Sequence, residues 1–194
     1  GLHRRIALRI LSVVGSSPLS LIGGILAASA FISMWVSNTA ACVMMLPIGL
    51  SIVEVVERGT RAQGRSLDDV AGRGFGTCVV LAIAYGVSIG GMASIIGTPP
   101  NGVLVGFLRE RYGQEISFLE WMKVGLPMTV LFLPLGSLLL ARVVFRVKSG
   151  RIDAIQDEIR RELADLGPIR RPEASILAIF LLCVVAWLTR PYLA

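Results

Sequence analysis

Charged residues are scarce in this sequence. Only 16% of its 194 residues are charged, whereas 54% are hydrophobic. A soluble domain carries about a quarter charged residues. Residues 12–53, 74–108 and 124–141 contain no charged residue at all. Uncharged runs of this length exceed what one soluble core can hold. They predict an all-α integral membrane protein, for which the lipid bilayer is the second solvent.

Histidine and cysteine are also scarce, and this excludes several kinds of site. His3 is the only histidine, and the three cysteines, Cys42, Cys78 and Cys183, show no CxxC spacing. A histidine-based metal site or a Ser-His-Asp triad is therefore hard to build, and we interpret the cysteines as small buried hydrophobic residues. Because no carboxylate side chain lies within the uncharged runs either, we do not expect an enzyme.

The net charge of +6 lies in the connectors between the uncharged runs. Lys and Arg number three in 1–11, four in 54–73, three in 109–123 and eight in 142–173. Positive charge collects in the cytoplasmic loops of membrane proteins, which favours a cytoplasmic location for all of these connectors except 109–123. No aromatic residues interleave with the basic ones, so we expect no nucleic-acid partner. The prediction is a multi-pass protein of the inner cell membrane, in contact with the lipid bilayer.

The chain divides into seven predicted segments. In order they are an amphipathic cytoplasmic helix over 1–16, a helical hairpin with its tip at Ser-Asn-Thr over 17–57, a cytoplasmic connector over 58–74, a broken transmembrane helix over 75–112, a transmembrane helix over 119–147, a charged cytoplasmic connector over 148–173 and a transmembrane helix over 174–192. The segment 1–16 has an alternative interpretation: it could form the last turns of a preceding transmembrane span. The chain opens with glycine and stops just after an apolar segment, so we expect a piece of a longer protein.

The first polar break lies inside the run 12–53, where Ser33 is followed by Ser37, Asn38 and Thr39. Two interpretations remain open. The segment could cross the membrane twice with a polar turn at the far surface, or it could be a re-entrant hairpin whose tip stops inside the membrane. A new helix is expected from Ala40, with Asn38 or Thr39 as its cap. The free N–H groups at its start would face an anion.

The second break is the run Gly97-Thr98-Pro99-Pro100-Asn101, inside 74–108. Each proline lacks an N–H and its ring clashes with the preceding helical turn, so backbone groups are freed at membrane depth. Such groups are tolerated there only where they line a watery or ion-filled cavity. We therefore expect half-helices over 75–90 and 102–111 around an unwound loop.

Both breaks carry the same chemistry. Hydroxyl, amide and backbone oxygens coordinate hard cations, and hydroxyl and N–H groups donate hydrogen bonds to carboxylates. Secondary transporters place such groups between broken helices near the middle of the bilayer. Two breaks of this kind in one chain favour a transport function.

The sequence around the breaks resembles a known family. The run AFISMWVSNTAACVMMLPI resembles the first hairpin signature of the divalent anion/sodium symporter family, and SIGGMASIIGTPPN resembles its unwound fifth-helix loop. The resemblance covers roughly residues 1–192. It implies two inverted repeats, each with a re-entrant hairpin and a broken helix, and a homodimer. The implied substrates are C4-dicarboxylates such as succinate, taken up with Na+ as the coupling ion.

The resemblance also implies site residues in this chain. It assigns sodium binding to Ser33, Ser37, Asn38, Gly91 and Gly97, and substrate binding to Ser37, Asn38, Thr39, Thr98 and Pro99. Asn101 is expected to secure the unwound loop. Only one such hairpin and one broken helix are present, so we expect the other half of the site from sequence outside this chain. Alternatives within the family are a sodium-independent exchanger and a citrate or sulfate symporter.

Overall fold

The computed structural model describes residues 2–15, 17–62, 64, 66–148, 153–169 and 171–193. Every regular element in these ranges is a helix, which confirms the all-α prediction. The elements are α1 (Leu2–Val14), α2 (Pro18–Ser33), α3 (Asn38–Ala62), α4 (Leu67–Val70), α5 (Phe75–Gly91), α6 (Pro99–Tyr112), α7 (Phe118–Leu138), the π-helix η1 (Leu139–Val144), α8 (Asp153–Asp165) and α9 (Arg171–Leu193).

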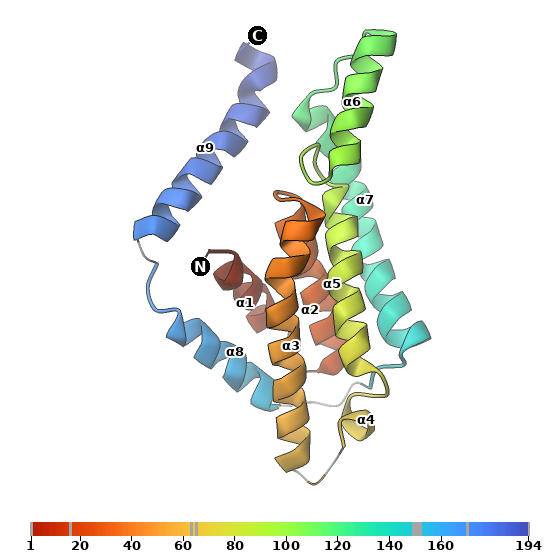
Figure 1. The fold of residues 1–194 in the computed structure, drawn as a ribbon, viewed down its shortest axis with the longest axis vertical. Helices are drawn as coiled ribbons and strands as arrows, with labels where there is room; N and C mark the ends of the chain where they lie inside the picture. Colours follow the sequence, from red (N-terminus) through yellow and green to blue (C-terminus); the bar gives the residue numbers. More distant parts are fainter. Residues whose placement is uncertain are drawn as a thin grey trace.

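Helix α2 is the centre of the bundle. It begins with a proline in its first turn and a reciprocal capping box in which the Ser17 hydroxyl accepts from the Ser20 N–H. Helices α1, α3, α5 and α7 all contact it (Figure 1). Its apolar side chains pack with those of α5 to form the main part of the core, which includes Leu21, Ile22, Ile25, Leu26, Val79, Ala82 and Ile83.

Two glycines let α2 and α5 approach closely. A Cβ atom on Gly86 would lie 2.6 Å from the carbonyl oxygen of Leu26, and a Cβ on Gly90 would overlap the backbone of Ala30. Small residues four apart are a common means of bringing membrane helices into backbone contact. The close approach places the last turns of α2 and α5 next to each other.

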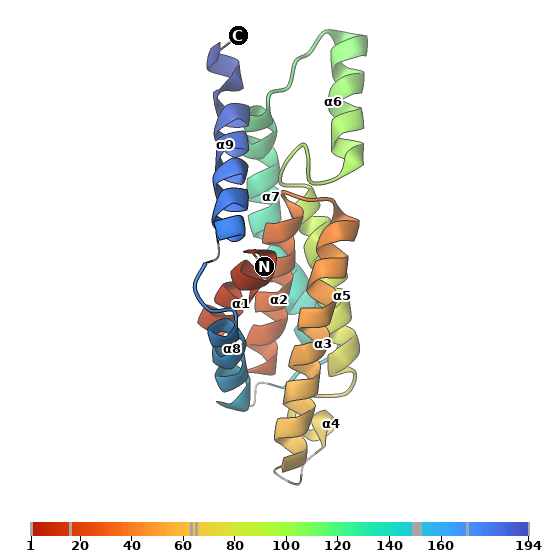
Figure 2. The ribbon, with the colours of Figure 1, turned by 60° about the vertical axis from the view of Figure 1, so that its left-hand side comes forward.

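The ends of these two helices lead into two breaks at the same level. Helix α2 turns at residues 34–37 and returns as the antiparallel helix α3, while the chain leaves α5 at Gly91 and resumes as α6 at Pro99. Figures 1 and 2 both show the turn between α2 and α3 beside the break between α5 and α6, with α6 continuing beyond it. The polar residues of both breaks are thereby brought together.

Both breaks differ in detail from the sequence-based expectation. Pro99 and Pro100 are not in the unwound loop but in the first turn of α6, where a missing N–H is tolerated because it has no partner in the helix. The unwound segment is therefore 92–98. Helix α3 begins at Asn38 rather than Ala40, and the Ser37 carbonyl accepts the Ala41 N–H at 3.0 Å. Ser37 thus takes the cap position.

Among the described residues, two helical stretches are long and apolar enough to cross a membrane, Asn38–Arg61 and Phe118–Val144. Helices α2 and α5 are shorter, with 16 and 17 residues. At a rise of about 1.5 Å per residue they measure roughly 25 Å, less than the roughly 30 Å of the hydrocarbon core of a bilayer.

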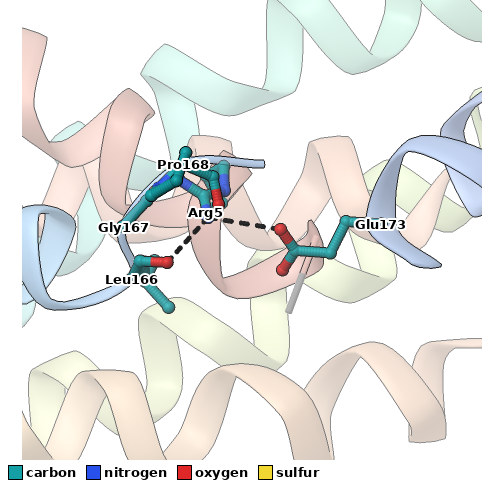
Figure 3. A network of polar contacts seen from close by, with 5 residues as sticks. All are labelled: Arg5, Leu166, Gly167, Pro168 and Glu173. Carbon is teal, nitrogen blue, oxygen red and sulfur yellow. Dashed lines mark hydrogen bonds and ion pairs between the residues drawn. The ribbon is translucent and has the colours of Figure 1, made fainter. Parts of the chain in front are cut away.

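A buried arginine joins α1 to the segment between α8 and α9 (Figure 3). Arg5 on α1 is only 6% exposed. Its Nη1 donates to the Gly167 carbonyl at 2.8 Å, and its Nη2 donates to the carbonyls of Leu166 at 3.1 Å and Pro168 at 3.4 Å. Nη2 also forms an ion pair with Glu173 Oε2 at 3.2 Å. Arg5 therefore ties α1 to the connector between α8 and α9 and to the first turn of α9.

Candidate functional site

The side-chain amide of Asn38 lies where the two breaks meet. One end of this amide is 2.8 Å from Ser33 Oγ, 3.0 Å from the Val87 carbonyl oxygen and 3.3 Å from the Gly97 carbonyl oxygen. Because carbonyl oxygens only accept, we assign this end as the NH2 group, whose two hydrogens are shared among the three oxygens. Asn38 thereby connects the start of α3 to the end of α2, to α5 and to the unwound segment.

Three neutral oxygens converge on this end of the amide. They are Ser33 Oγ and the carbonyl oxygens of Val87 and Gly97. The donor set is entirely of neutral oxygens, which are ligands that hard cations such as Na+ accept. The residues present therefore fit a bound sodium ion.

Glycine is required at two places around this amide. A Cβ on Gly91 would overlap the Asn38 amide, and a Cβ on Gly97 would lie 2.6 Å from the Gly91 carbonyl oxygen. Of the five residues assigned to sodium, the structure brings Ser33, Asn38, Gly91 and Gly97 together. The fifth, Ser37, is exposed, and its hydroxyl accepts weakly from the Ala40 N–H at 3.4 Å. The sodium-binding role of all five remains a prediction.

Ser94 connects the unwound segment to the hairpin turn. Its side chain is completely buried. Its hydroxyl donates to the carbonyl of Met34, at the end of α2, and accepts from the Gly97 N–H at 3.1 Å. Sequence reasoning did not identify this residue. Its only signal was a hydroxyl-bearing residue within an otherwise apolar part of the SIGGMASIIGTPPN run.

Asn101 holds the unwound segment from the other side. It lies in the first turn of α6, and its Nδ2 donates to the carbonyls of Gly91 and Ser94, each at 2.8 Å. Two freed carbonyls of the break are thus satisfied by one amide group. The expectation that Asn101 secures the loop is confirmed.

Helix α7 supplies two further donors that sequence reasoning missed. Trp121 Nε1 donates to the Met92 carbonyl at 3.0 Å, and Thr129 Oγ1 donates to the Ile89 carbonyl at 3.0 Å. Both carbonyls lie where the regular helix hydrogen bonds of α5 end. The Ile89 carbonyl also accepts the Met92 N–H at 3.3 Å, so Thr129 adds a second donor there. Nothing in the local sequence of α7 indicates these pairings, because they depend on how α7 packs against α5.

The residues assigned to substrate lie at the starts of α3 and α6. Ser37 and Thr39 are exposed, Asn38 and Thr98 are half-buried, and Pro99 is exposed. Thr98 is the N-cap residue of α6, but its side chain makes no capping hydrogen bond. No charged residue occurs in 33–39 or in 91–101. Their substrate-binding role also remains a prediction.

A helical hairpin turn beside a broken helix, with neutral oxygens converging between them, defines the class of protein as a membrane transporter of the broken-helix kind. The chain belongs to the family described as the sodium:sulfate symporter transmembrane region, whose family model matches residues 1–193. This membership confirms the resemblance seen in the sequence. It places the chain in a family of transporters rather than of enzymes.

Two curated relatives are named sodium-dependent dicarboxylate transporter SdcS. The protein of Staphylococcus saprophyticus is 38% identical over 192 residues, and that of Staphylococcus aureus strain NCTC 8325 is 37% identical over 192 residues. Each alignment covers 99% of this chain and 36% of the relative. The chain therefore spans about a third of the length of the relatives that it matches.

Proposed function

We propose that this chain forms the first hairpin and broken helix of a sodium-coupled secondary transporter of small divalent anions, with C4-dicarboxylates such as succinate as substrates. The observation that carries the proposal is the convergence of Ser33, Val87 and Gly97 oxygens on one end of the Asn38 amide. The names of the Staphylococcus relatives support both sodium and dicarboxylate.

The proposed roles divide along the two breaks. Ser33, Ser37, Asn38, Gly91 and Gly97 hold Na+, and Ser37, Asn38, Thr39, Thr98 and Pro99 contact the substrate. Since neither break contains a charged residue, a dianion needs compensating charge from elsewhere. Bound sodium supplies positive charge, and the first turn of α3 adds the positive end of its helix dipole.

The hairpin α2–α3 is proposed to be re-entrant rather than to cross the membrane twice. Helix α2 is too short to cross the hydrocarbon core on its own, and its turn lies beside the middle of the stack formed by α5 and α6 (Figure 1). The turn is also hydrogen-bonded to the unwound segment through Ser94 and Asn38. A turn exposed at the far surface would have water in place of these partners.

The placement of the remaining segments follows from the charge count. We propose a multi-pass protein of the inner cell membrane, with 1–16, 58–74 and 148–173 on the cytoplasmic side. The second half of the site would come from the rest of a longer protein, which we propose to be a homodimer. The coverage of 36% of the relative's length supports a longer protein, because an inverted second repeat would lie in the remainder.

The test is Asn38→Ala in the full-length protein. We expect sodium-dependent succinate uptake to be abolished, because the variant removes the group on which both breaks converge. Membrane abundance should be unchanged. The matched control is Gln114→Ala, which truncates an exposed amide side chain between α6 and α7 and should leave uptake at the wild-type level. Wild-type uptake by Asn38→Ala would contradict the site assignment.

Two measurements separate the alternatives. A sodium titration of uptake distinguishes a symporter from a sodium-independent exchanger, whose rate would not change with sodium. Competition of labelled succinate uptake by unlabelled succinate, citrate and sulfate identifies the anion. We expect succinate to compete most strongly, and stronger competition by sulfate or citrate would replace the dicarboxylate assignment.

A further inference from the structure

We propose that Ser94 is a positioning residue that holds the unwound segment against the hairpin turn and thereby sets the sodium affinity of the site. This inference rests on the proposed function. Ser94 is not among the residues that the family resemblance assigns to sodium or substrate. Its role follows only from the contacts between the two breaks.

The contacts form a closed ring. The Ser94 hydroxyl donates to the Met34 carbonyl and accepts from the Gly97 N–H at 3.1 Å. The carbonyl of Gly97 in turn faces the Asn38 amide at 3.3 Å. Asn38 and Met34 are four residues apart in the chain, so the backbone of the hairpin turn completes the ring. Ser94 is the member that fixes where Gly97 lies relative to the turn.

A hydroxyl is the right group for this position because it donates one hydrogen bond and accepts others at the same time. The Met34 carbonyl is one of the last carbonyls of α2, which have no partner inside the helix. The Gly97 N–H lies in the unwound segment, where it donates to the Ser94 hydroxyl at 3.1 Å and to the Ser94 carbonyl at 3.3 Å. Removing the hydroxyl takes the side-chain donor from the buried Met34 carbonyl and leaves the Gly97 N–H with the longer bond alone, and buried groups that lose a partner are costly.

Ser94 acts through Gly97 rather than as a ligand. Its hydrogen is directed at Met34, and one lone pair receives the Gly97 N–H. The oxygen that would face an ion is the carbonyl of Gly97, on the other side of the same residue. If that carbonyl shifts, one of the three oxygens around the Asn38 amide moves out of position while Ser33 Oγ and the Val87 carbonyl keep theirs.

The neighbouring helix offers a matched control. Ser88 lies on α5, six residues before Ser94, but it is exposed and its hydroxyl donates to the Ala84 carbonyl at 3.0 Å. Ser88→Ala therefore removes a nearby serine hydroxyl without touching the contact between the breaks. Ser94→Thr provides the converse control, because it retains the hydroxyl.

The first experiment measures uptake by the full-length protein against sodium concentration for Ser94→Ala, Ser94→Thr and Ser88→Ala. Ser94→Ala should raise the sodium concentration for half-maximal uptake at least about tenfold, with the maximal rate at saturating sodium within about threefold of wild type. Ser94→Thr should restore most of the affinity, and Ser88→Ala should match wild type. A lower maximal rate with unchanged sodium dependence would indicate a merely structural role and overturn the proposal.

The second experiment is independent of transport. A cysteine replaces Val36, a half-buried residue of the hairpin turn, in a protein whose native cysteines are replaced by alanine. Ser94→Ala should increase the rate of labelling of this cysteine by a water-soluble maleimide at least about fivefold in sodium-free buffer, whereas Ser88→Ala should not. Equal rates would overturn the role of Ser94 in holding the turn. Sodium-independent uptake by the wild type would instead contradict the proposed function, and the labelling rates would still report on Ser94.

Discussion

Two regions of this molecule solve the same structural problem with opposite chemistry. At the α5–α6 break, the neutral amide of Asn101 donates to the freed carbonyls of Gly91 and Ser94. At the α8–α9 connector, the charged guanidinium of Arg5 donates to three consecutive carbonyls and pairs with Glu173 (Figure 3). Both regions hold an interrupted helical path in place by side-chain donors, from 7 to 10 residues away for Asn101 and from more than 160 residues away for Arg5.

The difference teaches where charge can be used. A permanent cation beside the two breaks would compete with sodium and fix the charge of the site. Neutral donors avoid this, and they leave the electrostatic balance to the ion and the anion that are proposed to bind. The α8–α9 connector carries no such constraint, so a buried arginine can hold several carbonyls at once because its guanidinium has five donors in a fixed fork.

The largest effect is expected from Arg5→Gln. The variant removes the positive charge that pairs with Glu173 and the guanidinium that donates to three carbonyls. Breaking a buried ion pair of this kind costs about 3–5 kcal/mol. The free energy of unfolding of the purified full-length protein in mixed micelles measures this loss. Arg5→Lys should recover only part of it, because an ammonium lacks the planar fork. A loss below about 1 kcal/mol for Arg5→Gln would show that the contact contributes no more than a surface ion pair.

A smaller effect on stability is expected from Asn101→Ala. Two buried carbonyls lose their donor, and the expected cost is about 1–3 kcal/mol in the same unfolding measurement. Unlike Arg5→Gln, this variant should also raise the sodium concentration for half-maximal uptake, because Gly91 and the unwound segment lose their support. If Arg5→Gln weakened sodium binding as strongly as Asn101→Ala, the proposal that only the α5–α6 break affects sodium binding would be wrong.

The smallest effect is expected from Arg58→Gln, the exposed counterpart of Arg5→Gln. Arg58 pairs with Glu54 one turn away on α3, and both side chains are largely exposed, at 72% and 60%. Water and salt screen such a pair, so the free energy of unfolding should change by less than about 0.5 kcal/mol. A change close to that of Arg5→Gln would show that burial is not what separates the two arginines.

Much of the site could be predicted from the sequence because the relevant signals are local. Ser33 and the polar residues 37–39 stand out in an uncharged run, and Pro99 and Pro100 mark an interrupted helix whatever the rest of the fold does. The boundaries were harder to predict. The prolines lie in the first turn of α6 rather than in the loop, because the N–H groups of a first helical turn have no partner within the helix and their absence costs nothing there.

The sequence by itself determined that this is an all-α chain of a membrane transporter family, with two polar breaks in uncharged runs. Hydropathy and helix-breaking residues act over short distances, so they can be read along the chain. Only the tertiary structure decided that Ser94 meets Met34, that the Asn38 amide faces Val87 and Gly97, and that Arg5 reaches the connector more than 160 residues away. The first two contacts depend on the close packing of α2 against α5 through glycine, and the third depends on how α1 packs against α8 and α9. The local sequence does not indicate which distant donors and acceptors such packing brings together.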